Sequence, residues 1–193
     1  TGINNLKDTN NLRTSVINDL NYLGNNYIFN TGIKNNINVY LKNLNAVGKN
    51  DSEYKSSPSS ELMSIFELSS ELPLEKKSQT KFNKLTPKIS LRFNPSDMKN
   101  YSDVSREINV DNIFNINRLA MEDTLETGET LTVGLGYKME DKTDYNKYFK
   151  FDVATVLRNE EVNEISKATT LNKKKSNIFG SLENRFSDFW TLE

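Results

Sequence analysis

The chain has 193 residues, enough for one domain, and its 25 basic and 26 acidic residues give a formal net charge of −1. It contains no Cys and no His, which excludes disulfides, thiolate and imidazole catalysis and nearly every usual zinc site. The balanced charge argues against nucleic acid as a partner, and no constellation of carboxylates points to an enzyme, a cofactor or a metal. With 35% hydrophobic residues and a mean hydropathy of −0.67, two classes fit: a polar, loop-rich soluble protein, or a membrane β-barrel, which needs apolar residues only at alternate strand positions.

Along most of the chain apolar residues alternate with polar ones, as side chains do on the two faces of a β-strand. The first strand is expected near 12–23, followed by a tight turn at 24–26 and a second strand near 27–42. The second strand keeps its apolar residues on one face, with Asn35 as the single polar interruption. It would be about fifteen residues long, whereas a strand of a soluble protein usually has five or six.

The clearest strand is expected near 84–94. Its length of about ten residues suffices to cross a bilayer when tilted, since a transmembrane β-strand needs roughly 9–11 residues. Taken alone, this segment fits a half-buried strand of a soluble sandwich better, but its pattern recurs near 61–72, 129–140, 147–158 and 176–186, and a last strand begins at 189–193. Its apolar face carries Leu85, Pro87, Ile89, Leu91 and Phe93, and its polar face carries Lys84, Thr86, Lys88, Ser90 and Arg92.

Long and short connections alternate between these strands. Long polar segments lie near 43–60, 95–127 and 159–175, and short turns lie near Gly24, Glu75, Asp141 and Asp188. An outer-membrane barrel has this signature, with short periplasmic turns on one rim and longer external loops on the other. We therefore predict an all-β fold in which 1–193 are part of a single domain, an antiparallel up-and-down transmembrane β-barrel segment that is incomplete and open-edged. No stretch approaches 18 apolar residues, so no transmembrane helix is expected, and the unfinished last strand suggests a piece of a longer polypeptide.

Four segments, taken in order, resemble the barrel region of the lipopolysaccharide-assembly family LptD, in a form like that of α-proteobacteria. They are LTPKISLRFNPSDM at 85–98, DNIFNINRL at 111–119, ETGETLTVGLGYK at 126–138 and SNIFGSLENRFSDFW at 176–190. The resemblance implies a barrel in the outer membrane of a Gram-negative bacterium that inserts lipopolysaccharide into the outer leaflet without enzymatic activity. It also implies contact with outer-membrane lipid, an LptE-like plug lipoprotein and an LptA-like periplasmic bridge, the last through an N-terminal domain that this segment lacks.

A barrel of this kind needs a polar lumen for the anionic head of the lipid and an uncharged lipid face, because Lys or Arg near the bilayer midplane costs roughly 2–4 kcal/mol. We hypothesise that basic residues of the polar rows guide phosphates, and the alternative is that they are only solvated lumen residues. These candidates are Lys34, Lys84, Lys88, Arg92, Lys138, Lys150 and Arg158.

The apolar island inside the segment 95–127 is expected to anchor an external loop against the lumen or the plug. Arg118 is expected to pair with Asp111 or Asp123. The alternative is that Phe114 and Ile116 only bury against neighbouring loops. The candidate anchor residues are Asp111, Asn112, Phe114, Asn117, Arg118 and Asp123.

Two other functions stay open at this point. Another outer-membrane barrel, a porin or an uptake receptor, would show the same periodicity. A soluble carbohydrate-binding β-sandwich would instead pack its apolar rows against one another and stay monomeric in water.

Overall fold

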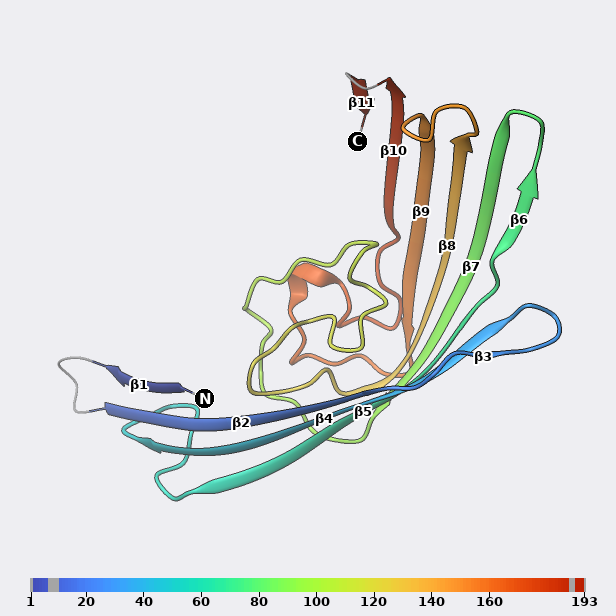
Figure 1. Cartoon of the computed structure of the whole chain (residues 1–193). Helices are drawn as coiled ribbons and strands as arrows, with labels where there is room; N and C mark the ends of the chain where they lie inside the picture. The colour runs from blue at the N-terminus through green and yellow to red at the C-terminus, as the bar shows by residue number, and fades with distance from the viewer. Residues whose placement is uncertain (1, 7–10, 188–189, 193) are drawn as a thin grey trace.

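The computed structural model describes residues 2–6, 11–187 and 190–192, whose strands form one antiparallel sheet (Figure 1). Apart from β3, which pairs with β4, and β6, which pairs with β7, the strands follow the order β1-β2-β4-β5-β7-β8-β9-β10-β11. Strands that follow one another along the chain pair with one another, so the sheet is up-and-down, and β1 and β11 lie at its two open edges. The prediction of an all-β, antiparallel, open-edged fold is therefore confirmed. The strands are β1 (Gly2–Leu6), β2 (Asn11–Leu23), β3 (Tyr27–Ile28), β4 (Lys34–Lys49), β5 (Ser59–Glu71), β6 (Leu74–Lys77), β7 (Lys81–Asn94), β8 (Gly128–Asp141), β9 (Tyr148–Arg158), β10 (Phe179–Ser187) and β11 (Trp190–Leu192).

One short 3-10 helix, η1 (Lys167–Thr169), lies in the connection between β9 and β10. Of the residues just given, none belongs to a helix that is long and apolar enough to cross a membrane.

The sequence predicted one continuous strand over 27–42, and this is wrong. The chain reverses between β3 and β4, where the N–H of Gly32 donates to the carbonyl of Phe29 and Gly32 takes a φ of 85°. The predicted turn residue Gly24 instead donates its N–H to the carbonyl of Ile37 on β4. Periodicity missed this reversal because the apolar residues before and after it happen to share one parity.

The predicted loop near 43–60 is shorter than expected, since β4 continues to Lys49 and β5 begins at Ser59. In this region the apolar residues change faces. Leu44 and Ile65, on neighbouring strands, are 1% and 2% exposed because a loop covers them. Where the apolar residues of a strand move from one face to the other, the alternation along the sequence is interrupted, and the segment resembles a loop.

The two faces of the sheet have different surroundings. We call the loops 95–127 and 159–178 the two long loops, and the side of the sheet on which they fold the inner face (Figure 1). Two small apolar cores form where the loops meet the strands. One joins Ile113 and Leu171 of the loops to Val156 of β9, and the other joins Leu125 to residues of β4 and β5.

On the opposite side, which we call the outer face, the apolar rows are uncovered. Ile37 is 61% exposed, Leu91 is 51% exposed and Phe93 is 45% exposed. A soluble sandwich would pack these rows against a second sheet. The observed arrangement is the opposite of the one that the sandwich alternative predicted.

Candidate functional site

A cluster of buried charges lies where the long loop 95–127 meets the inner face. The carboxylate of Glu126 accepts hydrogen bonds from Arg118 Nε at 2.7 Å, from Arg118 Nη2 at 2.5 Å and from the guanidinium of Arg158. Arg92 lies farther off, with Nη1 3.8 Å from Glu126. Burial alone would raise the pKa of Glu126, but the charge and hydrogen bonds of Arg118 and the charges of Arg158 and Arg92 outweigh it and bring the pKa to about 2.

A second carboxylate, that of Glu67 on β5, completes the cluster. Its Oε2 accepts hydrogen bonds from Arg92 Nε and from Ser90 Oγ, each at 3.0 Å. The side chains of Glu67 and Arg92 are each 4% exposed. Three guanidinium groups therefore share two carboxylates out of contact with water, and each group has a charged partner, as buried charges require.

Arg118 connects the loop to β8. Besides Glu126, its guanidinium donates to Thr132 Oγ1 at 3.0 Å and to Thr130 Oγ1 at 3.4 Å, and its side chain is fully buried. The expectation that Arg118 pairs with Asp111 or Asp123 is wrong. Asp111 is exposed, and the Asp123 carboxylate is engaged elsewhere.

Asp123 joins three segments of the loop region. Its carboxylate accepts hydrogen bonds from Tyr54 at 2.9 Å, from Tyr101 at 2.5 Å and from Lys99 at 2.9 Å. Burial would raise the pKa of Asp123, but the hydrogen bonds of Tyr101 and Lys99 outweigh it, so the pKa lies below its ordinary value. Burial, followed by the hydrogen bond to Asp123, raises the pKa of Tyr54. Asp123 thus links loop to loop, whereas Arg118 links loop to sheet.

Phe114 is the second point at which the long loop contacts β8. A Cβ at Gly134 would lie 2.8 Å from Phe114 Cζ, so the ring occupies space that only a glycine leaves free. The ammonium group of Lys88 lies 5.9 Å from the centroid of the same ring. Phe114 therefore buries against the sheet as well as against its own loop.

Two of the other predicted anchors make contacts within the loop, and the side chain of Asn117 also hydrogen-bonds Tyr40 of β4. Asn112 accepts the N–H of Asn109 and donates to the carbonyl of Glu107, which closes a local turn. The carbonyl of Asn117 accepts the N–H of Ala120. Periodicity did not single out Glu67 or Glu126. The partner of Glu67 becomes visible once β5 is paired with β7, and the partners of Glu126 only once the loop folds onto the sheet.

The basic residues of the inner face fall into two groups. Arg92 and Arg158 are held by Glu67 and Glu126 beneath the loops, and Arg158 also donates to the carbonyl of Leu171 at 2.9 Å. The hypothesis that these two arginines guide phosphates does not fit such surroundings, because both guanidinium groups are buried and already paired with carboxylates.

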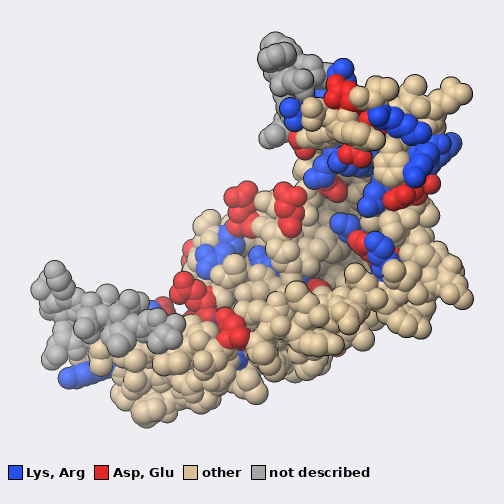
Figure 2. Space-filling view, in the orientation of Figure 1, with Lys and Arg blue, Asp and Glu red and all other residues tan. Residues whose placement is uncertain are grey.

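The long loop 95–127 buries Lys42 of β4, whose Nζ donates to the carbonyl of Glu122, but other lysines of the inner face remain accessible to solvent. The side chains of Lys34, Lys138 and Lys150 are 36%, 43% and 39% exposed. Figure 2 shows basic side chains gathered where β7, β8 and β9 project beyond the loops. We call this the turn end of the sheet, and the end covered by the long loops the loop end.

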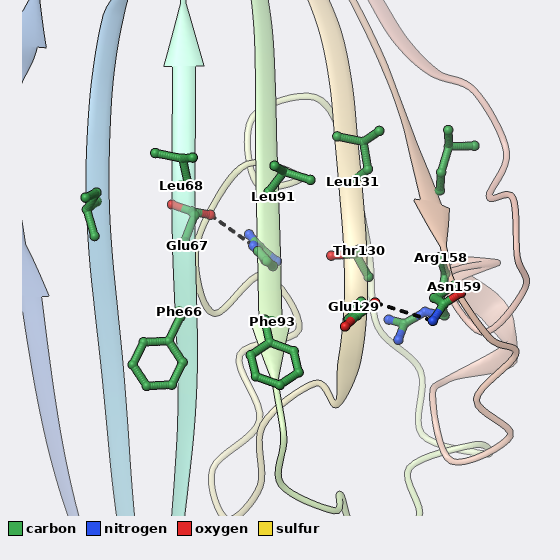
Figure 3. A pocket seen from close by; sticks show the side chains of 13 residues that line it. Phe66, Glu67, Leu68, Leu91, Phe93, Glu129, Thr130, Leu131, Arg158 and Asn159 are labelled. Atoms are coloured by element: carbon green, nitrogen blue, oxygen red, sulfur yellow. Dashed lines mark hydrogen bonds and ion pairs between the residues drawn. The ribbon is translucent and has the colours of Figure 1, made fainter.

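The outer face carries an apolar depression of about 680 Å³. Figure 3 shows its row of leucines, Leu68, Leu91 and Leu131, which occupy paired positions on β5, β7 and β8. Phe66 and Phe93 lie beside this row, and Glu129 of β8 hydrogen-bonds Asn159 at the polar margin. The outer face is thus apolar along the strands and becomes polar at their ends.

The whole chain was compared with known proteins. No curated protein matches it. The family model LptD, described as LPS transport system D, matches residues 5–193, which is nearly the entire sequence. The chain therefore belongs to the LptD family, whose members are transport components for lipopolysaccharide in the outer membrane of Gram-negative bacteria rather than enzymes.

Proposed function

We propose that this chain forms part of the wall of a transmembrane β-barrel, of the α-proteobacterial form, that inserts lipopolysaccharide into the outer leaflet. The observation that carries the proposal is the inversion of the two faces. Leu91 is half exposed on the outer face, while its neighbour Arg92 is buried on the inner face. Water does not favour such an arrangement, but a bilayer does, because lipid covers the apolar face.

The length of the apolar rows supports a membrane span. On β8 the outer-face row runs from Leu131 to Met139, about nine residues, and on β9 it runs from Phe149 to Leu157. A tilted transmembrane strand needs roughly 9–11 residues. The β8 row is followed at each end by an acidic residue, Glu129 or Asp141, as expected where a strand leaves the hydrocarbon.

The connections give the proposed wall a direction. The turns at 78–80 and 142–147 are short, whereas the two long loops lie together at the other end of the sheet. We assign the loop end to the external side and the turn end to the periplasm, following the usual asymmetry of outer-membrane barrels. The long loops then narrow the lumen on its external side.

The periplasmic side of the lumen is left for the partners of the transport machinery. We infer that an LptE-like plug lipoprotein lies against the open part of the inner face, and that an LptA-like bridge delivers lipopolysaccharide from the turn end. Periodicity alone also allowed a porin or an uptake receptor, and the family match is what favours lipopolysaccharide transport.

The direction of the strands can be tested with single cysteines, since residues 1–193 contain none and any cysteine elsewhere in the complete protein can be replaced beforehand. Ser57 and Ala168 are exposed at the loop end, and Gln79 and Tyr145 are exposed at the turn end. In the complete protein in intact cells, a membrane-impermeant thiol reagent is expected to label cysteines at the first two positions only. Permeabilising the outer membrane should then allow labelling at the other two.

A cysteine in place of Leu91 is the matched control, because lipid should protect it from the reagent before and after permeabilisation. Labelling at all four exposed positions in intact cells would contradict the assigned direction. Recovery of the protein in the soluble fraction would contradict the barrel itself.

A further inference from the structure

The basic residues of the inner face differ in burial and in charge pairing between the two ends of the sheet. At the loop end, the guanidinium groups of Arg92, Arg118 and Arg158 are buried with two carboxylates. At the turn end, the ammonium groups of the lysines are half exposed. Only the second group has charge available for a ligand.

Three of these lysines form a row across adjacent strands. Lys84 of β7 is paired with Lys138 of β8, which is paired in turn with Lys150 of β9. Neighbouring strands lie about 4.8 Å apart, so the row extends for roughly 10 Å. Like charges directly opposite one another destabilise a sheet. A glutamate faces each end of the row, Glu75 of β6 opposite Lys84 and Glu183 of β10 opposite Lys150, so Lys138 alone has a lysine on both sides.

Among the described residues, carboxylates form ion pairs with two of the three ammonium groups of this row. Lys138 and Lys150 lie 2.5 and 3.3 Å from Glu140 and Asp152, which are residues of their own strands. Exposed pairs of this kind contribute little to stability and exchange readily for other partners. Within the ranges that the structure describes, the ammonium group of Lys84 makes no hydrogen bond or ion pair, and its two paired neighbours are Glu75 of β6 and Lys138 of β8.

We propose that Lys84, Lys138 and Lys150 together bind phosphate groups of a ligand that moves along the inner face. Each ammonium group is a compact charge with three donors on a flexible stem, which suits transient contact with successive phosphates. The arginines of the loop end take no part in this site, because they are buried and paired with carboxylates. The proposal rests on the proposed function, because it requires the inner face to be the lumen. The phosphates can belong to a glycolipid headgroup or to a soluble compound.

Photocrosslinking in the complete protein, in its native envelope, tests the site. Phe82 shares a face of β7 with Lys84 and is only partly buried, so a benzophenone analogue of phenylalanine can replace it. We expect it to capture lipopolysaccharide. Lys84→Gln, Lys138→Gln and Lys150→Gln should each lower the capture about fivefold, the most that an exposed charge contact usually contributes. Lys147→Gln, in the neighbouring turn, should leave it unchanged.

The phosphate itself is tested with the protein purified in detergent. Enzymatic removal of the phosphates from lipopolysaccharide should abolish the capture at position 82. Inorganic pyrophosphate that competes at millimolar concentration would point to a soluble phosphate compound, and its failure to compete would point to the glycolipid headgroup. Capture that is independent of the three lysines, or of the phosphates, overturns the proposal.

A second crosslinker, in place of Asn38 on the same face of β4, separates the two hypotheses. If lipopolysaccharide is captured at position 38 but the three Lys→Gln changes do not affect capture at position 82, the phosphate site is refuted while the assignment of the inner face as the lumen stands. Capture at neither position, with the topology test also failing, would refute the barrel function.

Discussion

Removal of the Arg118 side chain is expected to release the long loop 95–127 from the sheet. This side chain is fully buried, and it joins Glu126 in the loop to Thr130 and Thr132 at the start of β8. In Arg118→Ala, the Glu126 carboxylate keeps its hydrogen bond from Arg158 but loses the partner that holds both of its oxygens.

The expected magnitude follows from the burial of the cluster. Removing one member of a buried ion pair costs roughly 3–5 kcal/mol. Since Glu126 retains Arg158, we expect a value near the lower limit, about 3 kcal/mol, which raises the detached fraction of the loop on the order of a hundredfold. Glu126→Gln leaves three guanidinium groups with Glu67 as the nearest acid, so its cost should approach the upper limit.

Detachment can be measured as the reaction rate of a buried cysteine. Thr124 lies in the same loop and is 0% exposed, so Thr124→Cys is a clean reporter once any cysteine outside residues 1–193 has been replaced. The complete protein in its envelope is treated with an impermeant thiol reagent, with and without Arg118→Ala. Lys167→Ala is the matched control, because it removes an exposed charge whose partner Asp103 lies 3.6 Å away. It should change the rate by a few-fold at most.

Equal labelling rates for Arg118→Ala and Lys167→Ala, in protein that is still folded in the membrane, would refute this reasoning. Such a result would mean that Asp123 and the apolar cores hold the loop without the charge cluster.

Three further outcomes are expected. The depressed pKa of Glu126 means that its stabilisation of the loop is complete above about pH 4.5 and is lost as the pH falls toward 2. Hydrogen exchange of the loop amides, corrected for the intrinsic pH effect, should show this loss, and Glu126→Gln should reduce its pH dependence to the part that Asp123 contributes. Gly134→Ala places a Cβ 2.8 Å from Phe114 Cζ and should loosen the loop by roughly 1–3 kcal/mol in the cysteine assay. Adding Phe114→Ala should then cost less than the sum of the two single changes, and strict additivity would contradict the packing. Leu91→Arg should destabilise the folded protein in the membrane by roughly 2–4 kcal/mol. The lower folded fraction should be seen as a loss of heat-modifiable migration on gels. A soluble sandwich would tolerate this change at an exposed residue to within about 0.5 kcal/mol, so a neutral result would contradict the membrane assignment.

The alternation of apolar and polar residues is a local property of the sequence, and it was sufficient to predict the class of the fold. A period of two assigns Leu91 and Arg92 to opposite faces whatever the rest of the chain does. The open, antiparallel, up-and-down sheet could therefore be predicted. Alternation failed where a turn preserved parity, between β3 and β4, and where apolar residues changed faces beneath a loop, as at Leu44.

The candidate site could not be derived in the same way, because its members are distant in sequence. Glu67 and Arg92 are 25 residues apart, and Arg158 and Glu126 are 32 residues apart. In the sequence, Arg92 and Lys84 are equivalent basic residues of one polar row. In the folded chain, Arg92 is buried with carboxylates, whereas Lys84 is aligned with two other lysines at the uncovered turn end. Residue order is enough to assign a side chain to a face, but its charge environment depends on which strands pair and which loop covers them, because both burial and neutralisation act through space.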